Sequence, residues 1–285
     1  MIDRKAVRRR FERAAPRYAD ASRLEAEVGA RMLERLDYVK IAPKRLLDAG
    51  CGPAREARAL GARYADAELV LLDLALPMLR LARRAGGMLS RLLGRRRPLA
   101  VCADLERLPL RPASMELAWS NMALHWAGDL FAAIREFHRV LAPEGLLMFS
   151  TLGPDTLKEL RAVAGAARVH AFADMHDIGD MLVAAGFAAP VMDAERITLS
   201  YAGATALLAD LRASGQTCAL AARPRGLAGK GFLSALTGGL EAQRLEGRLE
   251  ATFEVVYGHA WKAAPTRAAD GRAIVRFERA GGAGR

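Results

Sequence analysis

A glycine turn directly after a short apolar segment constrains this chain more than any other feature. The run Leu46-Leu-Asp48-Ala-Gly50-Cys-Gly52 predicts a strand ending in an acid, then a turn, and then a helix over 55–64. Glycines at 50 and 52 let the backbone approach a ligand where a Cβ would clash. This order of strand, turn and helix is typical of a nucleotide-binding α/β fold.

Short apolar segments then alternate with helical ones along the middle of the chain. We expect a Rossmann-like, seven-stranded and mostly parallel sheet with helices on both faces, together with N-terminal helices and a helical lid insertion. The predicted strands are 44–48, 69–73, 99–104, 115–120, 146–151, 191–201 and 252–261, and further helices are predicted at 77–85, 130–141, 156–164 and 177–185.

Five segments follow from this pattern. We expect a helical lid over 1–40, broken in two at Pro16, before a core over 41–201. An insertion over 202–250 is long enough to be a functional lid rather than a passive loop. The final core strand then occupies 251–262, and a tail over 263–285 is predicted to be mobile apart from the run Ala273–Phe277.

Charge and cysteine content narrow the class of protein. The formal net charge is +11, and seven arginines fall within residues 80–97. Because no aromatic residues interleave these arginines, we favour an acidic protein partner over nucleic acid. No apolar run is long enough to span a membrane. Three widely spaced cysteines without a CxxC pair indicate a reduced, cytoplasmic protein without a metal site. We also expect the protein to be a monomer.

Acidic residues close the first three predicted strands, namely Asp48, Asp73 and Asp104. Asp73 follows Gly52 by 73 − 52 = 21 residues, which is close to the spacing of a ribose-binding acid. Asp48 would repel a pyrophosphate but suits a ligand with an ammonium group and a sulfonium, and Ala54 replaces the third glycine of the dinucleotide motif. Asp104 is placed to accept a hydrogen bond from an adenine amino group. The pattern therefore favours S-adenosylmethionine over a dinucleotide.

From Asp48 to Gly145 the chain resembles the class I S-adenosylmethionine-dependent methyltransferases. The resemblance rests on 48–52, 72–73, 103–109, 117–121 and 140–145. It implies S-adenosylmethionine as cofactor. The residues we assign to its site are Asp48, Gly50, Gly52, Asp73, Leu74, Asp104, Leu105, Ser120 and Asn121.

Five further motifs resemble the malonyl-acyl-carrier-protein O-methyltransferase family. They are 11–18 (FERAAPRY), 119–126 (WSNMALHW), 149–157 (FSTLGPDTL), 174–179 (DMHDIG) and 253–261 (FEVVYGHAW). The resemblance implies methyl transfer to the free carboxylate of malonyl-acyl carrier protein, a step of biotin synthesis. The N-terminal helices and the insertion would then close over the site, and the acidic carrier protein would account for the positive charge.

Candidates for the acceptor site follow from the chemistry of a carboxylate. A malonyl carboxylate is already ionised at neutral pH, so the enzyme needs a cation to hold it rather than a general base. The insertion offers Arg212, Arg223, Arg225 and Lys230, and among these we select Arg225. Tyr18 and His125 complete the catalytic candidates, Tyr18 to close the methionine end of the pocket and His125 to bind the carboxylate.

Three positions depart from the family pattern and keep other functions open. Ala54 stands at the third glycine, Glu25 stands where a glutamine is usual, and His125 also replaces a glutamine. One alternative is a related S-adenosylmethionine-binding protein that hydroxylates an arginine during assembly of respiratory complex I. A second is a binding module without turnover. A nucleic-acid methyltransferase is a weaker third option, because no motif for a flipped base is present.

Overall fold

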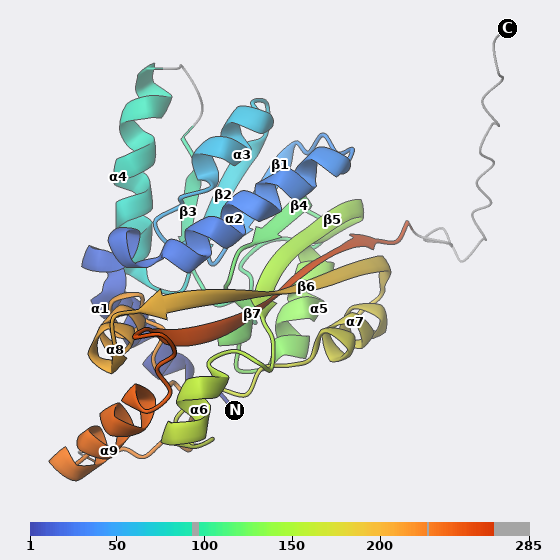
Figure 1. The fold of residues 1–285 in the computed structure, drawn as a ribbon. Helices are drawn as coiled ribbons and strands as arrows, with labels where there is room; N and C mark the ends of the chain where they lie inside the picture. Colours follow the sequence, from blue (N-terminus) through green and yellow to red (C-terminus); the bar gives the residue numbers. More distant parts are fainter. Residues whose placement is uncertain (93–96, 227, 265–285) are drawn as a thin grey trace, which may run out of the picture.

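The computed structural model describes residues 1–92, 97–226 and 228–264, with the backbone alone for 85–92 (Figure 1). Its strands are β1 (Arg45–Ala49), β2 (Glu68–Asp73), β3 (Leu99–Cys102), β4 (Met115–Ser120), β5 (Leu141–Leu152), β6 (Phe187–Tyr201) and β7 (Leu249–Lys262). Its helices are α1 (Arg4–Ala21), α2 (Arg23–Arg35), α3 (Ala57–Arg63), α4 (Leu76–Leu92), α5 (Leu130–Val140), α6 (Lys158–Ala164), α7 (Met175–Ala184), α8 (Ala204–Ala213) and α9 (Lys230–Glu241), with short 3-10 helices η1 (Leu36–Tyr38) and η2 (Leu124–Trp126).

The strands of the described chain form one seven-stranded sheet in the order β3-β2-β1-β4-β5-β7-β6. β1 to β5 are parallel, whereas β7 runs antiparallel to both of its neighbours. This confirms the predicted Rossmann-like sheet. Because the parallel strands end at one edge, the glycine turn after β1 and the acid closing β2 meet there.

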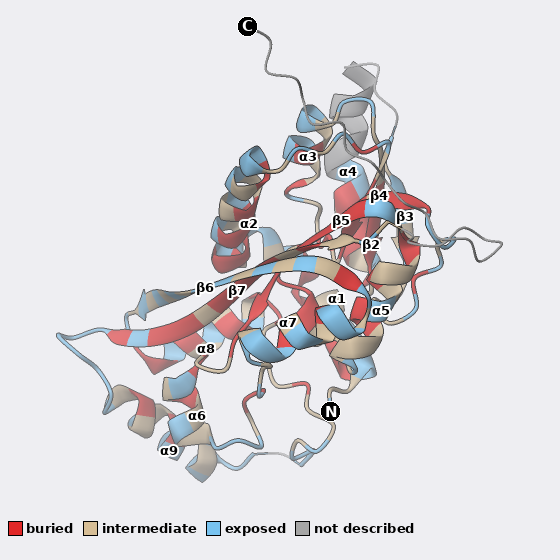
Figure 2. Cartoon of the chain, turned by 90° about the vertical axis from the view of Figure 1, so that its right-hand side faces the viewer, coloured by how far each residue is buried: buried red, intermediate tan, exposed pale blue. Residues whose placement is uncertain are grey.

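Helices cover both faces of the sheet because side chains of buried strands alternate between them. On one face, Leu46 and Trp119 pack against α2. Leu71 of β2 packs there against α4. On the other face, Leu47 and Phe149 pack against α5 and α7. Figure 2 shows the result, with buried strands in the centre and exposed outer surfaces on the helices.

The break between the first two helices differs from the prediction. Pro16 lies inside α1, which continues to Ala21, and the chain turns at Ser22 instead. Pro16 is exposed, and its ring costs α1 one backbone hydrogen bond without ending the helix. The Ser22 amide still donates to the Tyr18 carbonyl at 2.8 Å. The predicted break at Pro16 is therefore wrong.

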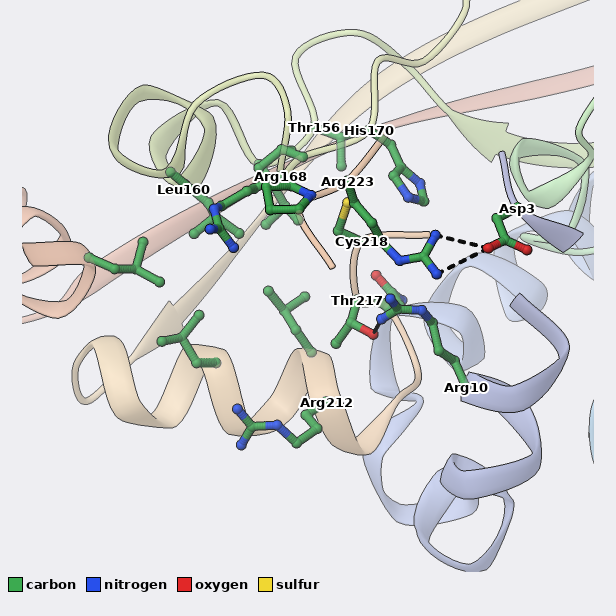
Figure 3. Close-up of a pocket in the computed structure, with 18 of the residues that line it drawn as sticks. Asp3, Arg10, Thr156, Leu160, Arg168, His170, Arg212, Thr217, Cys218 and Arg223 are labelled. Carbon is green, nitrogen blue, oxygen red and sulfur yellow. Dashed lines mark hydrogen bonds and ion pairs between the residues drawn. The ribbon is translucent and has the colours of Figure 1, made fainter. Parts of the chain in front are cut away.

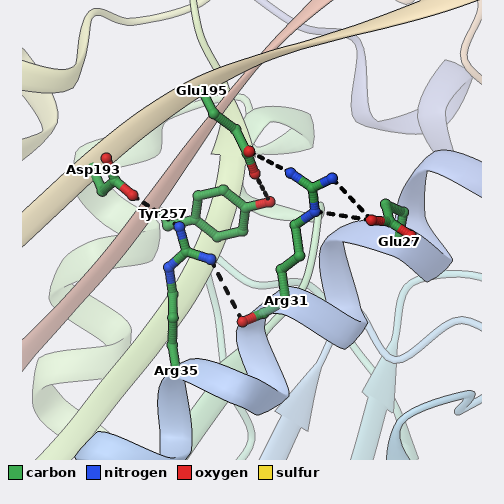
Figure 4. A network of polar contacts seen from close by, with 6 residues as sticks. All are labelled: Glu27, Arg31, Arg35, Asp193, Glu195 and Tyr257. Carbon is green, nitrogen blue, oxygen red and sulfur yellow. Dashed lines mark hydrogen bonds and ion pairs between the residues drawn. The ribbon is translucent and has the colours of Figure 1, made fainter.

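A polar network fastens α2 to the antiparallel strands (Figure 4). Arg31 pairs with Glu27 on its own helix and with Glu195 on β6. Arg35 pairs with Asp193 at 2.8 Å, and its guanidinium lies 3.8 Å from the ring centroid of Tyr257. These contacts hold α2 against β6 and β7.

The N-terminus and the insertion are joined directly. Ile2 and Leu220 form an antiparallel bridge, and the Asp3 amide donates to the Ala219 carbonyl at 2.8 Å. The predicted insertion contains α8 and α9, and β7 begins at Leu249, three residues before the predicted strand 252–261. Predictions for Arg95, Arg96 and the run 273–277 lie outside the residues whose structure is described, and for Arg91 the backbone alone is described.

No helix within the described ranges combines the length and the apolar character that crossing a bilayer requires.

Candidate functional site

The turn between β1 and α3 has the geometry that its glycines predict. Gly50 and Gly52 have φ of 78° and 53°, where L side chains are strained. A Cβ on Gly50 would lie 2.2 Å from the Cβ of Ala123. The amides of Gly50 and Cys51 donate to the Leu72 carbonyl at 2.7 and 3.0 Å. The turn is thus pinned to the end of β2.

Ala54 takes the same unusual conformation as the glycines, with φ of 59°. We expect Ala54→Gly to raise the free energy of unfolding by about 0.5–1 kcal/mol, because relief of left-handed strain exceeds the extra backbone entropy of glycine. Urea unfolding measures this. Ala59→Gly, at an exposed position of α3, should instead destabilise the protein. A destabilising Ala54→Gly would contradict the strain at this turn.

Asp73 closes β2 and binds two backbone amides. Its Oδ2 accepts from the Gly52 amide at 2.8 Å, and its Oδ1 accepts from the Ala75 amide at 2.7 Å. Burial raises the pKa of Asp73 to about 6, although these amides favour the ionised form. Each carboxylate oxygen can accept a further hydrogen bond, so Asp73 is placed to receive a pair of ligand hydroxyls.

Other buried carboxyl groups surround the same turn without a basic partner. Burial, and then Glu56 and Asp73, raise the pKa of Asp48 well above its ordinary value. Burial likewise raises the pKa of Glu56, in the first turn after the glycines. Among the residues that the structure describes, Asp48 Oδ2 is buried with no hydrogen-bond partner. In the described chain none of these three acids forms an ion pair, so the site favours a positively charged ligand.

Asn121 and Ser120 hold the end of β4 in place. Asn121 Nδ2 donates to the Glu25 carbonyl at 2.8 Å and to Glu56 Oε1 at 3.3 Å. Its Oδ1 accepts from Ser150 at 2.8 Å. Ser120 is fully buried and donates to the Ala49 carbonyl at 2.9 Å. Asn121 therefore contacts Glu56 beside the glycine turn, whereas Ser120 bonds to the β1 backbone inside the sheet.

A cavity of about 70 Å³ lies at this edge of the sheet, and we name it the glycine-turn cavity. The predicted residues that line it are Gly50, Gly52, Asp73, Leu74, Asp104, Leu105, Asn121 and Tyr18, whereas Asp48 and Ser120 do not. α1 covers it, since Val7 and Phe11 also line it. Arg4 of α1 binds Asp104 at 2.7 Å and Glu106 at 3.2 Å.

A second cavity, of about 630 Å³, lies between α1, α6, α8 and α9, and we name it the arginine cavity (Figure 3). Its walls are partly apolar, with leucines from α6, α8 and α9. Trp126 lines both cavities and therefore stands between them. The arginines that line the cavity are Arg9, Arg10, Arg168, Arg212, Arg223 and Arg225.

The structure places the three catalytic candidates differently. Tyr18 lies at the glycine turn, where burial and then the charges of Glu25 and Asp73 raise its pKa well above its ordinary value. Arg225 is exposed and lines the arginine cavity, as predicted for a residue of the insertion. His125 lines neither cavity. It is buried beside Trp126 and Phe172, and its Nδ1 lies 3.4 Å from Thr151 Oγ1.

The histidines near the arginine cavity are uncharged. Burial, and then His170, lower the pKa of His125 to about 3, and burial and then Arg10 lower that of His170 to about 4. Neither ring can therefore supply a positive charge to a carboxylate at neutral pH. This limits His125 to the role of a neutral packing or hydrogen-bonding group.

Sequence reasoning missed several residues at both cavities. Arg4 and Arg10 sit among other arginines of the first helix, and nothing in their spacing distinguishes them. Glu56 follows the glycine turn by four residues, a position that carries no motif. Trp126, the last residue of the motif 119–126, lines both cavities.

Comparison with known proteins agrees with this geometry. A family model described as a methyltransferase domain matches residues 47–149. The chain is 51% identical to the malonyl-acyl-carrier-protein O-methyltransferase of Methylovorus sp. over 97% of this chain and 95% of that one. It is 50% identical to the protein of the same name from Gallionella capsiferriformans, over 97% of each chain.

Solved structures show the fold alone. The YcgJ protein of Bacillus subtilis superimposes with a TM-score of 0.60 at 16% identity, covering 84% of this chain and all of that one. A putative methyltransferase from Bacillus halodurans gives the same score at 17% identity, covering 81% of this chain and 97% of that one. From the near-complete match to relatives at half identity, this chain belongs to the malonyl-acyl-carrier-protein O-methyltransferase family within the class I S-adenosylmethionine-dependent methyltransferases.

Proposed function

We propose that this chain transfers a methyl group to the free carboxylate of malonyl-acyl carrier protein, giving the malonyl methyl ester for biotin synthesis. The observation that carries the proposal is the arrangement of two cavities across Trp126. One is lined by Asp73 and Asp104, with the buried acids Asp48 and Glu56 at the same turn, and the other is lined by arginines. A cationic methyl donor and an anionic acceptor fit these opposite charges. The names of the relatives support the same acceptor.

The cofactor of this family is S-adenosylmethionine, which supplies a methyl group on a positively charged sulfur when bound. Residues of this chain fit its three parts. Asp73 would accept from the ribose hydroxyls, and Asp104 from the adenine amino group. The unpartnered carboxylate oxygen of Asp48 and the nearby Glu56 would stabilise the ammonium and the sulfonium. Tyr18 would close the methionine end, beside Gly52.

The acceptor side requires positioning rather than proton transfer. A malonyl carboxylate is ionised at neutral pH, so no residue has to remove a proton. The neutral states of His125 and His170 agree with this requirement. The apolar walls of the arginine cavity would displace water from the carboxylate, and its arginines would hold it. Arg225, at the exposed side of the cavity, would meet the incoming substrate.

We further propose that residues 1–40 and the insertion over 202–250 act as lids. Arg4, Val7 and Phe11 of α1 line the glycine-turn cavity and cover it. We infer that α1 moves aside when a nucleoside cofactor enters. Because Asp3 and Ile2 are hydrogen-bonded to the insertion, the two lids would open together.

The ion pair between Arg4 and Asp104 would hold α1 closed, so its removal should change the rate of this opening. We expect Arg4→Gln to speed both binding and release of S-adenosylmethionine about two- to fivefold, because a half-exposed ion pair contributes about 1 kcal/mol or less. Stopped-flow fluorescence of the tryptophans reports both rates. Arg8→Gln is the matched control, since Arg8 pairs with Glu12 within α1. Equal rates in wild type and Arg4→Gln would contradict the closure by α1.

Acyl carrier protein would dock at the open side of the arginine cavity. Arg9 and Arg212 are exposed there with Arg225, and Lys230 begins α9 nearby. Such a positive rim attracts an acidic protein. We propose that the chain acts as a monomer in the cytoplasm, with neither nucleic acid nor membrane as partner. The relatives do not favour the arginine-hydroxylase or inactive-module alternatives.

A transfer assay tests the proposal. Purified protein is incubated with methyl-labelled S-adenosylmethionine and either malonyl- or acetyl-acyl carrier protein. We expect label on the malonyl carrier alone, because the acetyl group offers no carboxylate. Cofactor binding without transfer to the malonyl carrier would refute the proposed function.

A further inference from the structure

Arg10 carries a guanidinium with too few partners for its position. It is half-buried on α1 and lines the arginine cavity. Its Nε is buried with no hydrogen-bond acceptor, and in the described chain its side chain bonds to Thr217 alone. Burial, and then the charges of Arg223 and Arg13, lower its pKa. A buried cation in this state is stabilised by an anion.

The other arginines of the cavity are either paired or exposed. Both terminal nitrogens of Arg223 bind Asp3 at 3.0 Å (Figure 3). Arg168 stacks on Phe232, with its guanidinium 3.9 Å from the ring centroid. Arg212 and Arg225 are exposed to solvent, which screens their charge. Arg10 therefore combines partial burial with unused donors in a way that Arg225 does not.

Arg10 also lies at the boundary between the two cavities. Its neighbour Phe11 lines the glycine-turn cavity, and the Phe11 ring meets the Trp126 ring edge-on with centroids 5.2 Å apart. α1 thus presents Phe11 to the methyl-donor side and Arg10 to the acceptor side. An anion held by Arg10 would lie near this boundary, where an acceptor has to be.

We propose that Arg10 is the specificity-determining residue that binds the free carboxylate of the acceptor. This rests on the proposed function and assigns to the N-terminal helix a role that we predicted from the sequence for Arg225. The guanidinium donates to the carboxylate through its unused N–H groups, with Thr217 holding its orientation. An acyl group without that carboxylate leaves Arg10 unpaired in the cavity, and the site discriminates against it.

The test compares the affinity of malonyl- and acetyl-acyl carrier protein for the full chain, with S-adenosylhomocysteine present to prevent turnover. Wild type should bind the malonyl carrier more tightly. Arg10→Gln should reduce the malonyl-to-acetyl affinity ratio about 10- to 100-fold while leaving acetyl-carrier binding unchanged. Arg10→Lys should recover part of the ratio, because an ammonium supplies the charge without the planar fork.

Two controls distinguish loss of carboxylate recognition from misfolding and from a general loss of positive charge. Unaltered S-adenosylhomocysteine affinity shows that Arg10→Gln has folded. Arg13→Gln removes a charge from an exposed position of the same helix and should leave the ratio unchanged. If Arg10→Gln keeps the wild-type malonyl-to-acetyl affinity ratio, or if Arg225→Gln loses that ratio instead, the role of Arg10 is overturned and the proposed function is not. A wild type with no preference for the malonyl carrier overturns the proposed function and this role together.

Discussion

Asp73→Asn should raise the dissociation constant of S-adenosylmethionine about 10- to 100-fold. Both carboxylate oxygens of Asp73 accept backbone amides, from Gly52 and Ala75. An asparagine offers one oxygen, so one buried amide faces an NH₂ group, which costs about 1–3 kcal/mol of folding stability. Loss of a charged hydrogen bond to a ribose hydroxyl costs about 1.5–3 kcal/mol of binding free energy. Calorimetric titration with the cofactor measures the second effect.

A matched substitution separates this effect from a general loss of charge. Asp66 is exposed, four residues before β2 reaches its buried part, and Asp66→Asn should leave the affinity within about twofold. Thermal unfolding of Asp73→Asn in the absence of cofactor shows whether the fold is retained. A folded Asp73→Asn protein that binds S-adenosylmethionine as wild type does would remove Asp73 from the proposed cofactor site.

Glu25→Gln should change how stability depends on pH. Burial raises the pKa of Glu25 to about 7 from a reference of 4.5. The folded protein therefore holds this proton more tightly than the unfolded chain. Its stabilising contribution is complete below about pH 4.5 and is lost as pH rises through about 7. The shift of about 2.5 pKa units corresponds to about 3 kcal/mol as an upper value.

Glutamine mimics the protonated acid, because Glu25 Oε1 already accepts from Gln216 at 2.6 Å and Oε2 has no partner. We expect equal stabilities for wild type and Glu25→Gln near pH 4.5, with the variant more stable above pH 7. Urea unfolding across this range, without cofactor, gives the difference. Glu27→Gln, at an exposed position of α2, should show no such gain. A Glu25→Gln protein that gains nothing at pH 8 would contradict the burial of this charge.

The core of the fold was predictable because its signals are local. A buried parallel strand reads as a short apolar run, and its end is marked by glycine or acid, as at Asp48 and Asp73. Pro16 misled the prediction because an exposed proline can remain inside a helix that tertiary contacts support. The extra length of β7, from Leu249, follows from pairing with β6, which is a contact distant in sequence.

The cofactor side was more predictable than the acceptor side. Glycines and acids at strand ends are placed by the sheet itself, so position in the motif determines position in space. Arg10 and Arg225 lie more than two hundred residues apart and reach one cavity because residues 1–3 pair with 219–221. No local pattern encodes that pairing. His125 likewise occupies a motif, yet packing turns it away from both cavities.

The chemical position of the transferred methyl group tests the account most directly. Malonyl-acyl carrier protein is incubated with the purified chain and S-adenosylmethionine, and the carrier is then analysed by intact-mass and fragment-ion mass spectrometry. We expect one added methyl group, on the distal carboxyl of the malonyl arm, with none on acetyl-carrier protein. A methyl group on the carrier polypeptide, or an unchanged malonyl arm with the cofactor bound, would contradict it.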